Sequence, residues 1–160
     1  MIYIKRAEKK DAKKLTDIKV HALMRDMQLY YEEKIGLEMV YNVIEDELFL
    51  MKRYIVYKIM RNSEIIGRFL LDPYDKGKMR VEDFAIVPEY QGRGYGLQVL
   101  QMIEEAYPYV KKWTLSALAR KIENQYMYQK AGYKEIERDD TEVKYQKVVS
   151  RKNGRLRVVK

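Results

Sequence analysis

Three glycines fall within five positions, Gly92, Gly94 and Gly96, where a predicted strand ending at Pro88 gives way to a predicted helix. Glycine lets a backbone approach a ligand closely and adopt positive φ. The first turn of a helix adds unpaired N–H groups at the positive end of the helix dipole. The stretch therefore predicts a cradle for an anion, and phosphate is the usual guest.

Two familiar nucleotide motifs do not fit this glycine loop. The dinucleotide fingerprint needs Gly-x-Gly-x-x-Gly directly after a strand, whereas this loop has the tighter Gly92-x-Gly94-x-Gly96 spacing and a preceding Pro88. No acidic residue follows on a second strand at the expected distance. The phosphate loop of nucleotide triphosphatases needs a Gly-Lys-Ser/Thr sequence, which is absent here. Both nucleotide interpretations are excluded.

Composition limits the class of protein. The 160 residues are 47% hydrophobic and 35% charged, which is ordinary for one globular domain. The absence of cysteine excludes disulfides, zinc–thiolate sites and cysteine nucleophiles, and a single histidine, His21, argues against a metal site. No apolar run reaches the roughly 18 residues that span a bilayer, and charged residues arrive too early for a signal peptide. We expect a cytoplasmic protein with no membrane partner.

The net charge of +8 is concentrated at the C-terminus. Residues 150–160 contain five basic and no acidic residues, which leaves about +3 (8 − 5) for residues 1–149. The main body is therefore not strongly basic, and nucleic acid is not expected as a partner. We expect one domain over residues 1–149 and a basic C-terminal extension over residues 150–160.

Periodicity predicts the elements that position the loop, in the order βααβββαβαββ. Alternating or β-branched segments predict seven strands, at residues 1–6, 54–60, 65–71, 80–87, 113–118, 133–136 and 142–149. Helical spacing predicts four helices, one capped by Asp11 and ending near Gly36, and others at 40–52, 97–107 and 122–130. The Asn153-Gly154 dipeptide predicts a hairpin turn into one more edge strand at 156–159. Trp113 is expected in the core.

Two blocks of sequence together carry a resemblance to a known family. The first is Ile86-Val87-Pro88 followed by Gln91-x-x-Gly94-x-Gly96, and the second is Asn124 followed by Tyr128-Gln129-Lys130-Ala131-Gly132-Tyr133. The pair resembles the signature of the GNAT superfamily of acetyl-CoA-dependent N-acyltransferases, and the resemblance covers essentially the whole chain. It implies an α+β fold with a mixed sheet of about seven strands flanked by about four helices. In that fold the fourth and fifth strands splay apart.

The resemblance also implies how acetyl-CoA is held, with no metal. The pantetheine arm pairs with the backbone of the fourth strand as an extra strand would. The pyrophosphate sits on the loop amides. The implied cofactor-binding residues are Phe84, Ala85, Ile86, Gln91, Gly92, Arg93, Gly94, Tyr95, Gly96, Leu97 and Asn124. Asn124 lies four residues before Tyr128, where many members show seven, so it is also interpreted as a helix cap.

Three residues are candidates for catalysis by implication from the family. Tyr128 stands where the family places the tyrosine that protonates the departing thiolate, and a phenol suits that role. Glu82 and Asp83 are alternatives for the base. Adjacent strand residues point to opposite faces, so only one of them can reach the acceptor, although a bulge would overturn that parity. Glu82 is slightly favoured.

The function expected is transfer of acetyl from acetyl-CoA to a primary amine by direct attack in a ternary complex. The alternative is an inactive acyl-CoA-binding sensor or partner protein with the same fold. The acceptor is a small-molecule or peptide amine that the sequence does not specify, because no residue of the first two helices dictates it. A monomer or a homodimer is expected.

Overall fold

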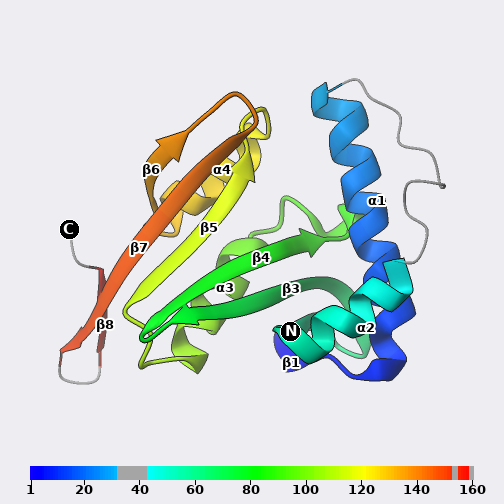
Figure 1. The fold of residues 1–160 in the computed structure, drawn as a ribbon, viewed down its shortest axis with the longest axis horizontal. Helices are drawn as coiled ribbons and strands as arrows, with labels where there is room; N and C mark the ends of the chain where they lie inside the picture. The colour runs from blue at the N-terminus through cyan, green and yellow to red at the C-terminus, as the bar shows by residue number, and fades with distance from the viewer. Residues whose placement is uncertain (32–42, 153–154, 159–160) are drawn as a thin grey trace. The chain divides into compact units, whose positions relative to one another are not determined.

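The computed structural model describes residues 1–31, 43–152 and 155–158. Short 3-10 turns at Lys9–Asp11 and Pro88–Tyr90 precede α1 and α3. The helices and strands, labelled in Figure 1, are β1 (Ile2–Arg6), α1 (Ala12–Tyr31), α2 (Val43–Arg53), β2 (Ile55–Arg61), β3 (Glu64–Asp75), β4 (Lys78–Ile86), α3 (Tyr95–Ala106), β5 (Lys112–Leu118), α4 (Ile122–Lys130), β6 (Lys134–Arg138), β7 (Glu142–Lys152) and β8 (Arg155–Val158).

The elements confirm the predicted α+β class. The seven predicted strands and four predicted helices are all present in the predicted order, and β8 pairs with β7 as the additional edge strand. The strands are hydrogen-bonded in the order β1-β2-β3-β4-β5-β7-β6, and the sheet is not closed. Two predictions fall outside the described residues: the break at Gly36, and the start of the second predicted helix at Val40 and Tyr41. None of the helices described is long and apolar enough to cross a bilayer.

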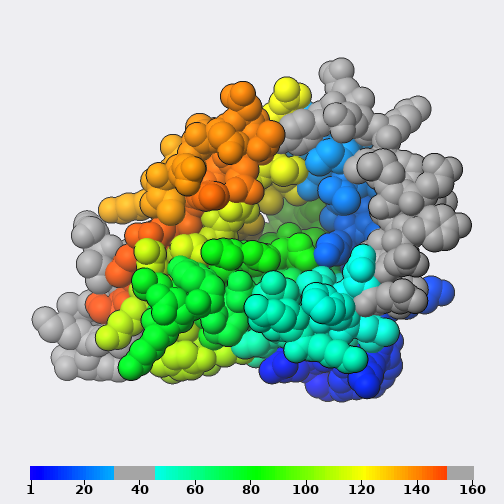
Figure 2. Space-filling model, viewed as in Figure 1, coloured from blue at the N-terminus to red at the C-terminus, as the bar shows by residue number. Residues whose placement is uncertain are grey.

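The chain divides into two compact units, and the first comprises Met1–Leu71 and Asp83–Tyr95. Here β1 and β2, and β2 and β3, pair as antiparallel neighbours. The helices α1 and α2 pack together, as Figure 1 shows in blue and cyan, and Figure 2 shows α2 at the surface. Leu15 of α1, Val56 of β2 and Leu70 of β3 form a buried apolar cluster, against which Leu50 and Met51 of α2 pack. This cluster fixes both helices to the hairpin of β2 and β3.

The second unit comprises Asp72–Glu82 and Gly96–Lys160. Its centre is the antiparallel pairing of β5 with β7, which extends over the full length of β5 from Lys112 to Leu118. Trp113 on β5 is fully buried and contacts the ring of Tyr107 edge-on, with 6.4 Å between ring centroids. The prediction that Trp113 lies in the core is confirmed.

A buried ion pair ties α3 and the end of α4 to β7 in this second unit. Lys147 Nζ on β7 donates to Glu104 Oε2 on α3 at 2.9 Å and to the carbonyl of Ala131 at 2.6 Å. Burial raises the pKa of Glu104, although its hydrogen bond to Lys147 acts in the opposite direction. Because Ala131 directly follows α4, the pair helps to fix the helix that carries Tyr128.

The strand β4 lies between β3 and β5 in the sheet, and its pairing with β5 covers only part of its length. Its parallel pairing with β5 is confined to three residues, from Lys78 opposite Lys112 to Arg80 opposite Thr114. Beyond Arg80 the two strands form no ladder, which confirms the expected splay of the fourth and fifth strands. Asp83 has a φ of 51°, so the backbone of β4 is irregular at this residue.

The helical start before α1 is a 3-10 turn. Its N-cap is Glu8, and Asp11 is the last residue of the 3-10 turn that leads into α1. The carboxylate of Asp11 accepts the backbone N–H of Glu8 at 2.8 Å and the ammonium of Lys58 at 2.8 Å. Asp11 directly precedes α1, and its carboxylate belongs to the capping box of the 3-10 turn, whose N-cap is Glu8.

Gly67 on β3 allows the backbone of β4 to approach closely. A Cβ at this position would lie 2.5 Å from the carbonyl oxygen of Ala85 and 3.3 Å from Cα of Ile86. Both of these atoms belong to backbone, which cannot move aside as the end of a flexible side chain can. A side chain at residue 67 would therefore push the two strands apart.

Replacing Gly67 by alanine is expected to destabilise the protein by about 2–3 kcal/mol, because the methyl group meets backbone rather than a movable side chain. The control is Gly77→Ala. Its φ of 69° carries a cost of about 1 kcal/mol, but its Cβ would come no closer than 3.9 Å to Tyr109. Chemical denaturation measures both variants. Equal losses would show that β3 and β4 do not approach closely at this point.

Candidate active site

The glycine loop has the geometry that the sequence predicts. Gly92 and Gly94 adopt φ values of 74° and 80°, a region that residues with side chains rarely occupy, and in the part of the chain that the structure describes a Cβ on either glycine would meet open space. The helix α3 begins at Tyr95, directly after the second of these glycines. The amides of Tyr95, Gly96 and Leu97 therefore belong to its first turn, where N–H groups have no partner within the helix. Loop and helix start together form a site suited to an anion.

The side chain of Gln91 connects the loop to the end of β4. Its Nε2 donates to the carbonyl oxygen of Ile86 at 2.7 Å, and its Oε1 accepts a long contact of 3.5 Å from Arg25 of α1. A glutamine is suited to this position because its amide carries both a donor and an acceptor. Gln91 is thus a residue that holds the loop, and this explains why the motif begins with it.

Phe84, Ala85 and Ile86 are predicted to pair with the pantetheine arm through their backbone groups. Only some of these groups lie on the edge of β4 that faces away from β3. The N–H of Val87 donates to the carbonyl of Ile66 on β3, and the carbonyl oxygen of Ala85 lies against Gly67 on β3. Because backbone groups alternate between the two edges of a strand, those of Phe84 and Ile86 face the opposite edge. Phe84 and Ile86 are therefore the two members of the predicted set whose backbone groups are not turned toward β3, and cofactor binding by Phe84, Ala85 and Ile86 stays a prediction.

The two candidate carboxylates lie in different surroundings. Oε1 of Glu82 lies 3.6 Å from the guanidinium of Arg80, two residues earlier on β4. Oδ2 of Asp83 accepts a hydrogen bond of 2.9 Å from Lys19 Nζ of α1, and Arg68 Nη2 of β3 lies 3.8 Å away. The side chain of Asp83 is 31% exposed. Two cations from other elements thus converge on Asp83, one of them within hydrogen-bond distance, whereas Arg80, which contacts Glu82, lies on β4 itself.

Arg68, one of the two cations near Asp83, also forms a buried ion pair. Arg68 is fully buried, and its Nη1 contacts Oε1 of Glu47. Glu47 is a residue of α2 and is almost equally buried. Nε and Nη2 of Arg68 and Oε2 of Glu47 make no hydrogen bond among the described residues. Desolvating two charges is costly unless they compensate each other, so this pair depends on both partners being present. Sequence reasoning missed Lys19, Glu47 and Arg68, because nothing in the local pattern distinguishes them from surface charges.

Tyr128 lies in the second unit and is buried, with 3% of its surface exposed. Its ring contacts Tyr145 edge-on at 5.8 Å and Tyr133 at 6.3 Å between centroids. Burial raises the pKa of Tyr133 well above the ordinary tyrosine value. The three rings form an apolar aromatic cluster that fixes the orientation of Tyr128.

Asn124 lies in the first turn of α4 and does not cap it. The N-cap position is Lys121, because α4 begins at Ile122. The interpretation of Asn124 as a helix cap was therefore wrong. Gln125, the next residue, makes the contacts that anchor this helix start, with its Nε2 donating to the carbonyls of Leu118 and Ala119.

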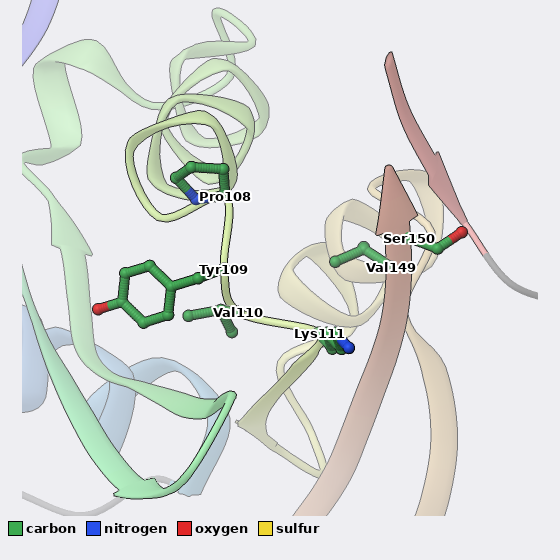
Figure 3. A pocket seen from close by; sticks show the side chains of 6 residues that line it. All are labelled: Pro108, Tyr109, Val110, Lys111, Val149 and Ser150. Carbon is green, nitrogen blue, oxygen red and sulfur yellow. The ribbon is translucent and has the colours of Figure 1, made fainter. Parts of the chain in front are cut away.

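A pocket of about 300 Å³ lies in the second unit between the loop after α3 and the end of β7 (Figure 3). Pro108, Tyr109 and the following two residues line one side, and Val149 and Ser150 line the other. Figure 3 shows the ring of Tyr109 directed away from β7. None of the predicted site residues lines this pocket.

Similarity to solved structures defines the class of fold. An acetyltransferase from Thermus thermophilus matches with a TM-score of 0.75 and 18% identity, covering 91% of this chain and 96% of its own. The PaiA N-acetyltransferase from Thermoplasma acidophilum, in complex with coenzyme A, matches with 0.72 and 16%, covering 92% and 99%. YncA from Salmonella typhimurium, with its cofactor acetyl-CoA, matches with 0.67 and 15%, covering 91% and 92%. The fold is that of the acetyltransferases.

The sequence assigns the family. The family model described as an acetyltransferase (GNAT) domain matches residues 52–135, a little over half of the chain. The chain therefore belongs to the GNAT acetyltransferase family, as the two sequence blocks implied. No curated protein matches it in sequence.

Arg68→Met is expected to cost about 3–5 kcal/mol of stability, because Glu47 would keep a buried charge without its partner. The double variant Arg68→Met, Glu47→Met should recover most of that loss, since two apolar side chains of similar size suit a dry site. Urea unfolding of both variants and the wild type measures the difference. A double variant as unstable as the single one would contradict a charge-compensation role for the pair.

Proposed function

We propose that this protein is an N-acetyltransferase that moves the acetyl group of acetyl-CoA to a primary amine within a ternary complex in the cytoplasm. The observation that carries the proposal is the loop at residues 91–96. Two of its glycines have positive φ, it opens directly into α3, and Gln91 links it to the end of β4. Membership of the GNAT acetyltransferase family supports acetyl transfer as the general reaction.

The proposed binding mode assigns the two ends of coenzyme A to different backbone groups. The amides of residues 92–97 hold the pyrophosphate, with Arg93 as a nearby positive charge. The outward-facing backbone groups of Phe84 and Ile86 pair with the pantetheine amides, as a neighbouring strand would. The carbonyl of Ile86 already accepts from Gln91, so its N–H is the group proposed to polarise the thioester carbonyl. Asn124 is kept as a proposed contact to the cofactor.

The proposed reaction consists of one addition to the thioester carbon followed by one elimination of the thiolate. The neutral amine forms a C–N bond to the thioester carbon, the C–S bond then breaks, and the thiolate leaves. Tyr128 gives its phenolic proton to the thiolate, and a carboxylate takes the proton that the amine loses. We favour Glu82 as this base, and Asp83, whose Oδ2 accepts a hydrogen bond from Lys19, is the alternative.

The direct test begins with coenzyme A and the unmodified protein. Saturating coenzyme A should raise the melting temperature, because a ligand that binds only the folded state stabilises it. Release of free thiol from acetyl-CoA is then screened against polyamines, amino acids, aminoglycosides and peptides. An amine that stimulates release confirms the enzyme. Coenzyme A binding with no release across the panel would favour the alternative of an acyl-CoA-binding sensor, and no binding would refute the proposal.

Tyr128→Phe is expected to lower kcat about 100-fold, because it removes one proton donor while keeping the ring that packs on Tyr133 and Tyr145. The KM for acetyl-CoA should stay within about twofold of the wild-type value. Tyr126→Phe is the matched control, since Tyr126 lies on the same helix with its side chain exposed. An unchanged kcat in Tyr128→Phe would exclude Tyr128 as the acid.

Glu82→Gln is expected to lower kcat/KM for the amine about 100-fold, because it removes the proposed base without changing size. Asp83→Asn should lower it by less than about tenfold, through the weaker interaction of residue 83 with Lys19 and Arg68. Steady-state kinetics with the best amine of the panel separate the two. The opposite ranking would assign the base to Asp83.

A further inference from the structure

Two tyrosines flank the exposed part of the glycine loop. Tyr90 ends the 3-10 turn before Gln91, and Tyr95 is the first residue of α3 after Gly94. Their ring centroids lie 6.5 Å apart with an interplanar angle of 38°. The four residues between them are exposed. The positions of these two rings therefore define the two ends of the loop.

Arg61, the last residue of β2, lies close to both tyrosines. Its guanidinium carbon lies 5.2 Å from the centroid of the Tyr90 ring, within the range of a cation–π contact. The same guanidinium lies near the hydroxyl of Tyr95, and its proximity lowers the pKa of Tyr95. Arg61 is remote from the loop in sequence, so both contacts are tertiary ones made by the end of β2.

Glu64 completes the attachment from the other side of the same hairpin turn. Its Oε2 accepts a hydrogen bond of 2.8 Å from the hydroxyl of Tyr90. Within the loop, Arg93 also lies over the Tyr90 ring, with 5.1 Å from its guanidinium carbon to the centroid. The turn between β2 and β3 thus holds Tyr90 by its ring and its hydroxyl, and the ring of Tyr90 lies beside that of Tyr95.

The loop needs such an attachment because its own residues supply little packing. Among the described residues, apart from the neighbours in the chain, no atom lies within 4 Å of where a Cβ would stand on Gly92 or Gly94, and both have positive φ. Glycine has more backbone freedom to lose than any other residue, so ordering this loop on binding would weaken affinity. A loop that is already held in its binding conformation avoids that loss.

We propose that Arg61 is a positioning residue for coenzyme A, which holds Tyr90 and Tyr95 so that the loop between them keeps its binding conformation before the ligand arrives. This inference rests on the proposed function, because it assigns coenzyme A to the loop. Arg61 acts through the two tyrosines and does not itself contact the ligand.

The test compares Arg61→Met with the wild type by calorimetric titration of coenzyme A and of 3′-dephospho-coenzyme A. Arg61→Met should weaken both ligands about tenfold, because a poorly ordered loop binds the shared pyrophosphate less well. Arg53→Met is the matched control, since Arg53 lies over the ring of Tyr54 at 5.1 Å in the same unit, and it should change neither affinity. Loss for coenzyme A alone would mean a direct contact to the 3′-phosphate and would overturn the proposal, as would no loss.

A second readout needs no ligand. Amide hydrogen exchange of residues 91–96 should be several-fold faster in free Arg61→Met than in the free wild type, while exchange in β2 and β3 stays unchanged. Equal loop exchange in the two proteins would overturn the positioning role even if affinity fell. If the wild type itself bound no coenzyme A, the proposed function would fail, whereas faster loop exchange would still show that Arg61 orders the loop.

Tyr95→Phe tests whether Arg61 affects coenzyme A binding through Tyr95. It removes the hydroxyl that Arg61 lies near and keeps the ring, so it should weaken coenzyme A by a similar factor. The double variant should then be little weaker than either single variant, because both changes break the same attachment. Independent, multiplying losses would show that Arg61 acts by another route and would overturn the proposal.

Discussion

The structure depends on the different use of the two edges of β4. On one edge the backbone meets β3 so closely at Gly67 that no side chain fits there. On the other edge pairing with β5 ends after Arg80. A strand edge left without a ladder has backbone donors and acceptors that need partners, and an extended ligand can supply them. The proposed role of Phe84 and Ile86 follows from this asymmetry.

Side-chain contacts in the first unit hold the end of β4 and the glycine loop that follows it. Gln91 fixes the start of the loop to the carbonyl of Ile86, and Arg61 lies over the ring of Tyr90 at the end of the 3-10 turn before the loop. Lys19 and Arg68 converge on Asp83 at the irregular position of β4. These attachments use charged and polar groups on residues far apart in sequence. They order the backbone locally, and they leave the exposed glycines open to a ligand.

The fold could be predicted well from the sequence because the relevant signals are local. The loop after Pro88, the alternation in the strands and the helical spacing each act over a few residues, and the seven strands and four helices confirm them. The sequence could not predict that the carbonyl of Ala85 faces β3, because the positive φ of Asp83 interrupts the regular backbone that a parity argument assumes. Nor could it identify Arg61 or Arg68, whose roles arise from tertiary contacts made by residues distant in the chain.

Amide hydrogen exchange of the wild-type protein with and without coenzyme A tests most directly whether the free edge of β4 and the glycine loop together bind this ligand. Coenzyme A is expected to protect two segments, residues 84–86 at the end of β4 and residues 92–97 at the start of α3, while the pocket lined by Pro108 and Val149 is unaffected. Protection confined to other segments, or none at either of these two at saturating coenzyme A, would contradict that binding mode.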